Sequence, residues 1–217
     1  ELSGLQADVF YHLAWHGSAG EARSDIWAQE ANICFTLEAV EQAARMGCKR
    51  FVFAGSISEL EIREKRRQTD RIDPWDGYAF AKSCADDLGR CLAKKLGIDY
   101  MTGCITNAYG IGERSERLIC RTLQAIREGK EVFFTEGKQF YDFIYITDVA
   151  QAFAAIGQRG KAGKSYLVGS GHPRPLRAWM EELLEVSGGK GRFGAVPFTS
   201  ARLEEADLST TELETDT

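Results

Sequence analysis

The stretch Lys49-Arg-Phe-Val-Phe-Ala-Gly-Ser56 decides the fold of this chain of 217 residues. It is a short apolar run of strand-forming residues, as is typical of a strand that is covered on both faces of a sheet. A similar run, Asp8-Val-Phe-Tyr-His-Leu-Ala14, precedes it. The two runs predict two buried strands.

A helix is predicted between these two strands. Its apolar positions recur at helical spacing, at Ile26, Ile33, Leu37, Val40 and Ala44. Gly47 supplies a stop at its carboxyl end. A strand, a helix of this length and a second strand indicate a right-handed parallel crossover.

The same alternation continues along the chain. Further helices are expected at Tyr78–Leu96, Leu118–Arg127, after Thr147-Asp148 and at Leu176–Val186. Further strands are expected at Asp99–Ile105, Glu131–Phe134 and Ser165–Gly169. The pattern therefore predicts an α/β fold with a doubly wound parallel sheet.

Charge and composition argue against several kinds of partner. The net charge is −5, and no basic stripe interleaved with aromatic residues is present, so we do not expect nucleic acid to be a partner. The one basic cluster, Arg63–Arg67, is flanked by acidic residues and is interpreted as a solvated loop. No apolar run approaches the roughly 20 residues of a membrane span, so no membrane partner is expected.

The cysteines and the acidic end of the chain carry little functional information. Six cysteines occur without a Cys-x-x-Cys pair, which indicates neither a metal site nor a disulfide framework and favours a cytoplasmic location. The run Glu204–Thr217 is acidic and rich in threonine, and we interpret it as a frayed or cut terminus. The Gly-rich segment Gly188–Gly194 follows a helix and is interpreted as a loop.

Tyr78-Ala-Phe-Ala-Lys82 places a phenol and an ammonium four residues apart on one helix face. A nearby cation favours the phenolate, so we expect Lys82 to lower the pKa of Tyr78 and make it a general base. The alternative is a packed tyrosine beside a solvated lysine. Ser56 supports the catalytic interpretation of Tyr78, because it ends an apolar strand at the edge where open α/β sheets bind ligands.

With these motifs in order, the chain resembles the extended short-chain dehydrogenase/reductase family, the NAD-dependent epimerase/dehydratase group that includes UDP-glucose 4-epimerase. The resemblance rests on motifs in family order: His12-Leu-Ala14, Asn32, Phe51–Ser56, Tyr78-x-x-x-Lys82, Asn107–Gly112, Asp142–Ala150 and Tyr166–Gly171. It implies a partial Rossmann-type sheet with a smaller C-terminal substrate-binding region.

The family resemblance also implies roles for individual residues. Ser56, Tyr78 and Lys82 would be catalytic, with Ser56 also contacting the substrate. Leu13, Ala14, Trp15 and Asn32 would lie along an NAD or NADP cofactor together with Tyr78 and Lys82, and Asn107 would bind the nucleotide-sugar. The alternative is a helix-packing amide for Asn32 and a loop-bracing amide for Asn107.

The resemblance divides the chain into four segments. Residues 1–110 would belong to a dinucleotide-binding domain, 111–140 to an insertion in the substrate region, 141–171 to a return to the first domain, and 172–217 to a truncated substrate-binding region. The Gly-rich turn that holds the cofactor phosphates in this family has no counterpart here, so we expect it to lie outside this sequence.

Two departures weaken the usual contacts to the substrate diphosphate, since Tyr141 and Cys104 stand where many relatives have arginine. Arg114, Arg117 and Arg121 could supply a replacement charge. The neighbours of Ser56 are Ile57, Ser58 and Glu59, without the acidic pair of a dehydratase, which slightly favours an epimerase or a reductase.

The expected function is thus that of an NAD(P)-dependent nucleotide-sugar epimerase or reductase, an isomerase or oxidoreductase that transfers hydride with Tyr78 as general base. The alternative is a non-catalytic truncated paralogue that binds a sugar nucleotide or a partner subunit. A homodimer through the helices Ser24–Met46 and Tyr78–Leu96 is also expected.

Overall fold

The centre of the molecule is a parallel sheet. The computed structural model describes residues 5–199 and 203–217, and its main sheet has four strands in the order β1-β2-β3-β8. All neighbours in this sheet are parallel. The strands are β1 (Val9–His12), β2 (Arg50–Ser56), β3 (Asp99–Ile105) and β8 (Ser165–Val168).

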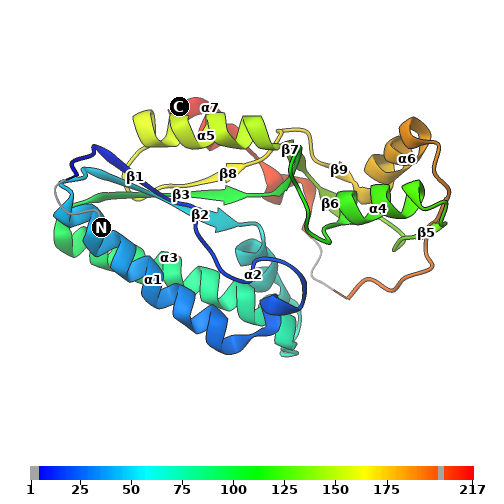
Figure 1. The fold of residues 1–217 in the computed structure, drawn as a ribbon, viewed down its shortest axis with the longest axis horizontal. Coiled ribbons are helices and arrows are strands. Elements are labelled where there is room, and N and C mark those ends of the chain that lie inside the picture. The colour runs from blue at the N-terminus through cyan, green and yellow to red at the C-terminus, as the bar shows by residue number, and fades with distance from the viewer. Residues whose placement is uncertain (1–4, 200–202) are drawn as a thin grey trace.

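Helices cover both faces of this sheet, which confirms the predicted doubly wound α/β architecture (Figure 1). The long helices α1 (Ile26–Arg45) and α3 (Gly77–Leu96) pack on one face. The helices α5 (Ile146–Arg159) and α7 (Thr211–Asp216) lie on the other. The chain folds this way because each buried strand needs apolar cover on two sides.

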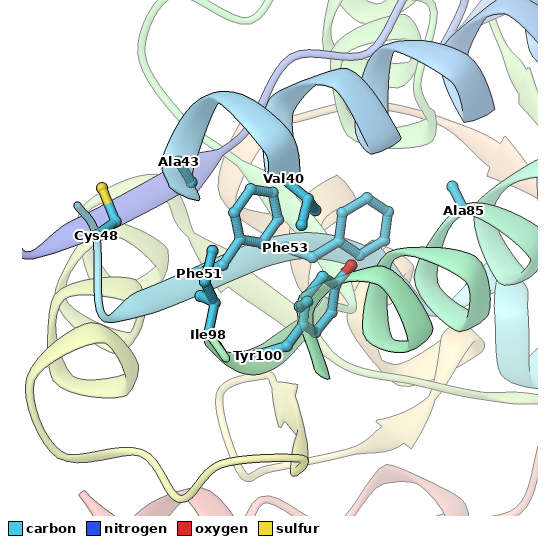
Figure 2. Close-up of a cluster of buried hydrophobic side chains, with 9 residues drawn as sticks. Val40, Ala43, Cys48, Phe51, Phe53, Ala85, Ile98 and Tyr100 are labelled. Atoms are coloured by element: carbon cyan, nitrogen blue, oxygen red, sulfur yellow. The ribbon is translucent and has the colours of Figure 1, made fainter. Parts of the chain in front are cut away.

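Alternate side chains of β2 point to opposite faces of the sheet and pack into two separate hydrophobic cores. Phe51 and Phe53 point toward α1 and α3, where they pack with Val40 and Tyr100 (Figure 2). Their rings are stacked on that of Tyr100, at centroid distances of 5.2 Å from Phe51 and 6.3 Å from Phe53. On the opposite face, Val52 and Ala54 join a second cluster beneath α5. The strict alternation follows from the two-residue period of a strand.

A smaller region lies beyond the carboxyl ends of the sheet strands (Figure 1). It contains the helices α4 (Leu118–Arg127) and α6 (Leu176–Ser187). Its core is made of Phe134, Phe143, Leu176 and Met180. Its short strands are β4 (Asn107–Tyr109), β5 (Val132–Phe133), β6 (Phe140–Tyr141), β7 (Phe143–Tyr145), β9 (Arg174–Pro175) and β10 (Gly191–Arg192).

The interpretation of Arg63–Arg67 as a loop was wrong. These residues belong to a helix, α2 (Ser58–Gln68), that follows β2 directly. The helix buries Ile62 and the stem of Lys65, whose ammonium is 2.9 Å from Asp73 and 2.6 Å from Asp76. Leu60 also packs against the cluster of Ile57, Leu203 and Leu208, so tertiary contacts hold a helix whose charged sequence shows no apolar stripe.

The interpretation of Glu204–Thr217 as a frayed end was also wrong. Leu208 is buried, and a 3-10 turn, η3 (Glu205–Leu208), leads into α7. The phenol of Tyr166 on β8 donates a hydrogen bond of 3.1 Å to Asp216, so α7 is fastened to the sheet. The Gly188–Gly194 segment, interpreted as a loop, contains β10, which pairs with β5 over Gly191 and Arg192.

Replacement of Phe51 by alanine is expected to lower the free energy of unfolding by about 3–5 kcal/mol, because the side chain is fully buried and leaves a cavity. Phe133→Ala provides the matched control, since that ring is 51% exposed and should cost less than about 1 kcal/mol. Urea unfolding of both variants measures the difference, and equal losses would contradict the assignment of the core.

His12, at the end of β1, should make stability depend on pH. Burial, and secondarily the charge of Lys82, lower its pKa from 6.5 to about 4. The unfolded chain therefore takes up the proton first as the pH falls, and stability is lost between pH 6.5 and 4. The loss attributable to His12 should reach up to about 3 kcal/mol.

Urea unfolding of the wild type and of His12→Gln between pH 7 and 4 checks this expectation. The stability of the wild type should fall relative to that of the variant as the pH drops. His172→Gln, at an exposed histidine, should instead run parallel to the wild type. Parallel curves for His12→Gln would show that His12 does not carry the effect.

Candidate active site

A cleft of about 710 Å³ opens where β1, β2 and β3 end. Parallel strands present their carboxyl ends at one edge, so segments distant in sequence meet there. The cleft brings together most of the predicted site residues, namely Leu13, Trp15, Ser56, Tyr78, Lys82 and Asn107. Ala14 and Asn32 are not among the described residues that line it.

Tyr78 begins the long helix α3 and lies in the cleft with only 6% of its surface exposed. The guanidinium of Arg23 stacks over its ring at 4.3 Å from the centroid, and Trp15 meets it edge-on at 6.0 Å. Burial raises the pKa of Tyr78, while a hydrogen bond with Ser56 and the charges of Arg23 and Arg117 act in the opposite direction.

The expectation that Lys82 alone would lower the pKa of Tyr78 does not match this structure. The net direction is upward, and the opposing cations are Arg23 and Arg117. The ammonium of Lys82 is directed elsewhere, to the carbonyl of Ala54 at 2.7 Å. Desolvation of the phenol therefore outweighs the cations around it.

Lys82 lies one helical turn after Tyr78 and is 4% exposed. Its ammonium lies 3.8 Å from the centroid of the Trp15 ring and 4.7 Å from that of Phe53. Burial lowers the pKa of Lys82 to about 8, and the charge of Glu59 works against that loss. The lysine is therefore close to its titration at neutral pH.

Ser56 is the last residue of β2 and the turn into α2 starts from it. Its hydroxyl accepts a hydrogen bond of 3.3 Å from the backbone N–H of Ser58. Its own backbone N–H donates to the carboxylate of Glu59 at 2.7 Å. These two bonds hold the serine at the floor of the cleft, next to Tyr78.

The loop after β1 is held in place by two amides of α1. Asn32 accepts from the backbone N–H of His16 at 2.9 Å and donates to its carbonyl at 2.8 Å. Gln29 accepts from the indole N–H of Trp15 at 3.0 Å. Asn32 thus braces this loop, and Gln29 fixes the Trp15 ring against Lys82.

Asn107 opens β4, which pairs with β7 in parallel. Both its backbone N–H and its side-chain amide lie 3.2 Å from the carbonyl of Asp142. Asp142 is fully buried, and its carboxylate accepts from the backbone N–H groups of Ser170 at 3.0 Å and Gly171 at 3.2 Å. Asn107 lines the cleft but already has a partner within the protein.

Arg23 is the principal site residue that sequence reasoning missed. It lies in the 3-10 turn η1 (Gly20–Ser24), donates to the hydroxyl of Ser58 at 3.0 Å, and keeps a buried Nε without a hydrogen-bond partner in the described structure. No spacing rule links it to Tyr78. Its only sequence signal is its place in the loop that leads from Leu13 into α1.

The two departures from the family pattern have different positions. Tyr141 lines the cleft, and burial raises the pKa of its phenol. Cys104 lies buried on β3 and is not among the described residues that line the cleft. Burial raises the pKa of its thiol. Of the three arginines proposed as replacements, Arg117 lines the cleft, whereas Arg114 and Arg121 are not among its described lining residues.

The cleft suits a nicotinamide dinucleotide on two grounds. The volume is within the range of ligand pockets, and polar groups converge at the strand ends. Lys82, Trp15 and Leu13 would hold the ribose and nicotinamide end. Among the described residues, no group of acidic, histidine or cysteine side chains could bind a metal ion, and no helix has the length and apolar character to cross a bilayer.

Curated proteins similar to this chain include dehydratases and a reductase. A ketoreductase of 4-hydroxy-2-methyl-3-oxo-4-farnesyl-3,4-dihydroquinoline-1-oxide from Stigmatella aurantiaca is 24% identical over 200 residues, which cover 90% of this chain and 58% of that protein. The dTDP-glucose 4,6-dehydratase of Escherichia coli is 30% identical over 117 residues, 54% of this chain and 32% of the relative. The matched part of the chain therefore spans 58% of the first relative's length and 32% of the second's.

Solved structures with the same fold cover nearly the whole chain. RMD from Pseudomonas aeruginosa, complexed with NADPH, superposes with a TM-score of 0.74 at 20% identity, over 97% of this chain and 77% of that one. A double mutant of DesIV, a dTDP-glucose 4,6-dehydratase from Streptomyces venezuelae with NAD bound, gives 0.75 at 20% identity, over 98% and 67%.

The sequence profile described as "NAD dependent epimerase/dehydratase family" matches residues 2–169. That match spans β1 to β8 and includes Ser56, Tyr78 and Lys82. The chain belongs to the NAD dependent epimerase/dehydratase family.

Proposed function

We propose that this protein is an NAD(P)-dependent enzyme that oxidises a carbinol carbon or reduces a carbonyl carbon of a nucleotide-sugar, as an epimerase or a reductase. The observation that carries the proposal is the convergence of Ser56, Tyr78 and Lys82 in one cleft at the carboxyl ends of parallel strands. This is where ligands bind in open α/β sheets.

Each of these residues has a role that fits its surroundings. Tyr78 would take the proton from a sugar hydroxyl as the phenolate when the sugar is oxidised, and as the phenol it would give a proton to a carbonyl oxygen when the sugar is reduced. Ser56, which acts to lower the pKa of Tyr78, would bond the reacting oxygen. Lys82 would hold the cofactor ribose from its buried position beside Trp15. A bound nicotinamide would supply the hydride acceptor or donor.

Arg23 and Arg117 would help Tyr78 to act as a base. Burial opposes formation of the phenolate, and the pKa of Tyr78 is raised on balance. The guanidinium that stacks on the ring stabilises negative charge as it develops on the phenol oxygen. Proton removal would therefore depend on these two cations.

An epimerase or reductase is favoured over a 4,6-dehydratase by the position of Glu59. Its carboxylate accepts from the backbone N–H of Ser56 and is not among the described residues lining the cleft. It therefore does not point toward a bound sugar. Ile57 and Ser58, its predecessors, offer no carboxylate, and the carboxyl group of this helix that does line the cleft is that of Glu61.

A second substrate class has support of its own. The Stigmatella relative, which is named as a ketoreductase of a farnesylated quinoline oxide, aligns with 90% of this chain. Aromatic rings also line the cleft here, among them Trp75, Tyr109, Tyr141 and Phe143. Titration with dTDP and UDP separates the two classes, because only an enzyme for nucleotide-sugars should bind a free nucleoside diphosphate.

Replacement of Tyr78 by phenylalanine is expected to lower turnover of the full-length protein by about 10²–10⁴-fold, because the general base is lost. The assay would follow NADH formation or consumption with UDP-, dTDP- and CDP-sugars. Binding of NADH, followed by its fluorescence, should remain, since the ring still packs on Trp15 and Arg23.

Tyr11→Phe is the matched control, because Tyr11 is 38% exposed and its hydroxyl lies against α5 at Gly157, outside the cleft. Its turnover should equal that of the wild type. Unchanged turnover in Tyr78→Phe would remove the proposed base. Failure of the full-length wild type to bind NADH would instead support the non-catalytic alternative.

We also propose a homodimer formed by the outer surfaces of α1 and α3. These helices pack against one another and leave Trp27 81%, Phe35 55% and Leu88 44% exposed. Sedimentation velocity should give a dimer for the wild type and a monomer for Phe35→Glu. Val186→Glu, on α6 and 83% exposed, should remain dimeric, and a monomeric wild type would exclude this assembly.

A further inference from the structure

Glu59 is a buried carboxyl group on the far side of Ser56 from the cleft. It stands in the first turn of α2 and is 6% exposed. Its Oε1 atom accepts the backbone N–H of Ser56 at 2.7 Å. A carboxylate buried to this degree is costly unless charge or hydrogen bonds compensate for it.

The backbone leaves a space for this carboxyl group at Gly55. A Cβ atom built on Gly55 would lie 3.0 Å from Glu59 Oε1, 2.7 Å from Thr102 Cγ2 and 3.1 Å from Cys104 Sγ. The glycine is therefore required by close packing. Glu59 occupies the layer between the sheet and α3, the same layer that holds Lys82.

The charged side chains of that layer lie close together. The Lys82 ammonium donates to the carbonyl of Ala54 and the Glu59 carboxylate accepts from the N–H of Ser56, so both reach the last three residues of β2. Asp86 and Arg90 are joined by a hydrogen bond of 3.0 Å between Nε and Oδ2, and the hydroxyl of Thr102 also donates to Asp86. With Asp86 compensated by Arg90, the remaining buried charges are those of Glu59 and Lys82. Each acts on the pKa of the other in the direction that favours both charged forms.

We propose that Glu59 is a positioning residue of the active site, whose carboxylate fixes Ser56 from behind and favours the ammonium form of Lys82. The inference deepens the function proposed above and rests on it for the catalytic meaning of Lys82. It explains why a strand that ends in a catalytic serine carries a glycine one residue earlier and a buried glutamate three residues later.

The pair should titrate together near neutrality. Burial, followed by the charge of Asp86, raises the pKa of Glu59 to about 7, and burial lowers that of Lys82 to about 8. The other charged or titratable groups that face the pair are Tyr78, Asp86, Arg90, Tyr100 and Cys104, with Arg63 beyond Cys104. Burial raises the pKa values of Tyr78, Tyr100 and Cys104, so these three remain neutral in this range.

Trp15 provides a direct optical readout of the charge on Lys82. The ammonium lies 3.8 Å from its ring centroid, so loss of that charge changes the electric field at the indole and shifts its emission. The full-length protein would be titrated from pH 6 to 9.5 without substrate or cofactor. Subtracting the titration of Trp15→Phe removes the signals of the other tryptophans, and Lys82→Met should abolish the transition.

In Glu59→Gln the midpoint of the Trp15 transition should fall by about one pH unit or more, because the removed negative charge favoured the ammonium. Glu64→Gln is the matched control on the same helix. Glu64 pairs at the surface with Arg67 and Gln68, and its removal should leave the midpoint unchanged. Glu59→Asp, which retains the charge, should keep most of the wild-type midpoint.

A midpoint that stays in place in a folded Glu59→Gln protein would overturn the proposal and leave Glu59 as a cap for Ser56 only. If Glu59→Gln does not fold, the titration of the wild type still tests the proposal. The absence of a Trp15 transition between pH 6 and 9.5 would overturn the coupling of Glu59 and Lys82. The titration involves no turnover. If the midpoint shifts in Glu59→Gln but Tyr78→Phe remains active, the coupling of Glu59 and Lys82 stands and the proposed role of Tyr78 in proton transfer falls.

Discussion

The structure depends on one constraint, that β2 is buried on both faces along its length. Phe51 and Phe53 fill the side toward α1 and α3, and Val52 and Ala54 fill the side toward α5. A strand with this composition cannot lie at a wet surface, so helices must cover both faces. Its position in turn fixes Ser56 at the carboxyl edge, within reach of the first turn of α3.

The sheet and long helices could be predicted because their signals are local and strong. The apolar runs around Phe10 and Phe53 and the helical period from Ile26 to Ala44 correspond to β1, β2 and α1. The helix α2 was missed because its stability comes from tertiary contacts. Lys65 is held by Asp73 and Asp76, and no period in the sequence reveals such pairs.

The candidate site was predictable as a set of residues but not as an electrostatic environment. Motif order placed Ser56, Tyr78 and Lys82 together, and the cleft contains all three. Whether the pKa of Tyr78 is raised or lowered depends on how deeply the phenol is buried and on the charge of Arg23, which lies in the turn η1 before α1. Desolvation is a property of the packed molecule, so spacing along the chain cannot supply it.

Asp142 links the main sheet to the smaller region of the molecule. Its carbonyl receives both hydrogen bonds of Asn107, and its carboxylate receives those of the segment after β8. Gly169 admits no side chain there, since a Cβ atom would lie 2.2 Å from Asp142 Oδ2. One buried carboxylate therefore ties the sheet, through the segment after β8, to the smaller region that contains α4 and α6.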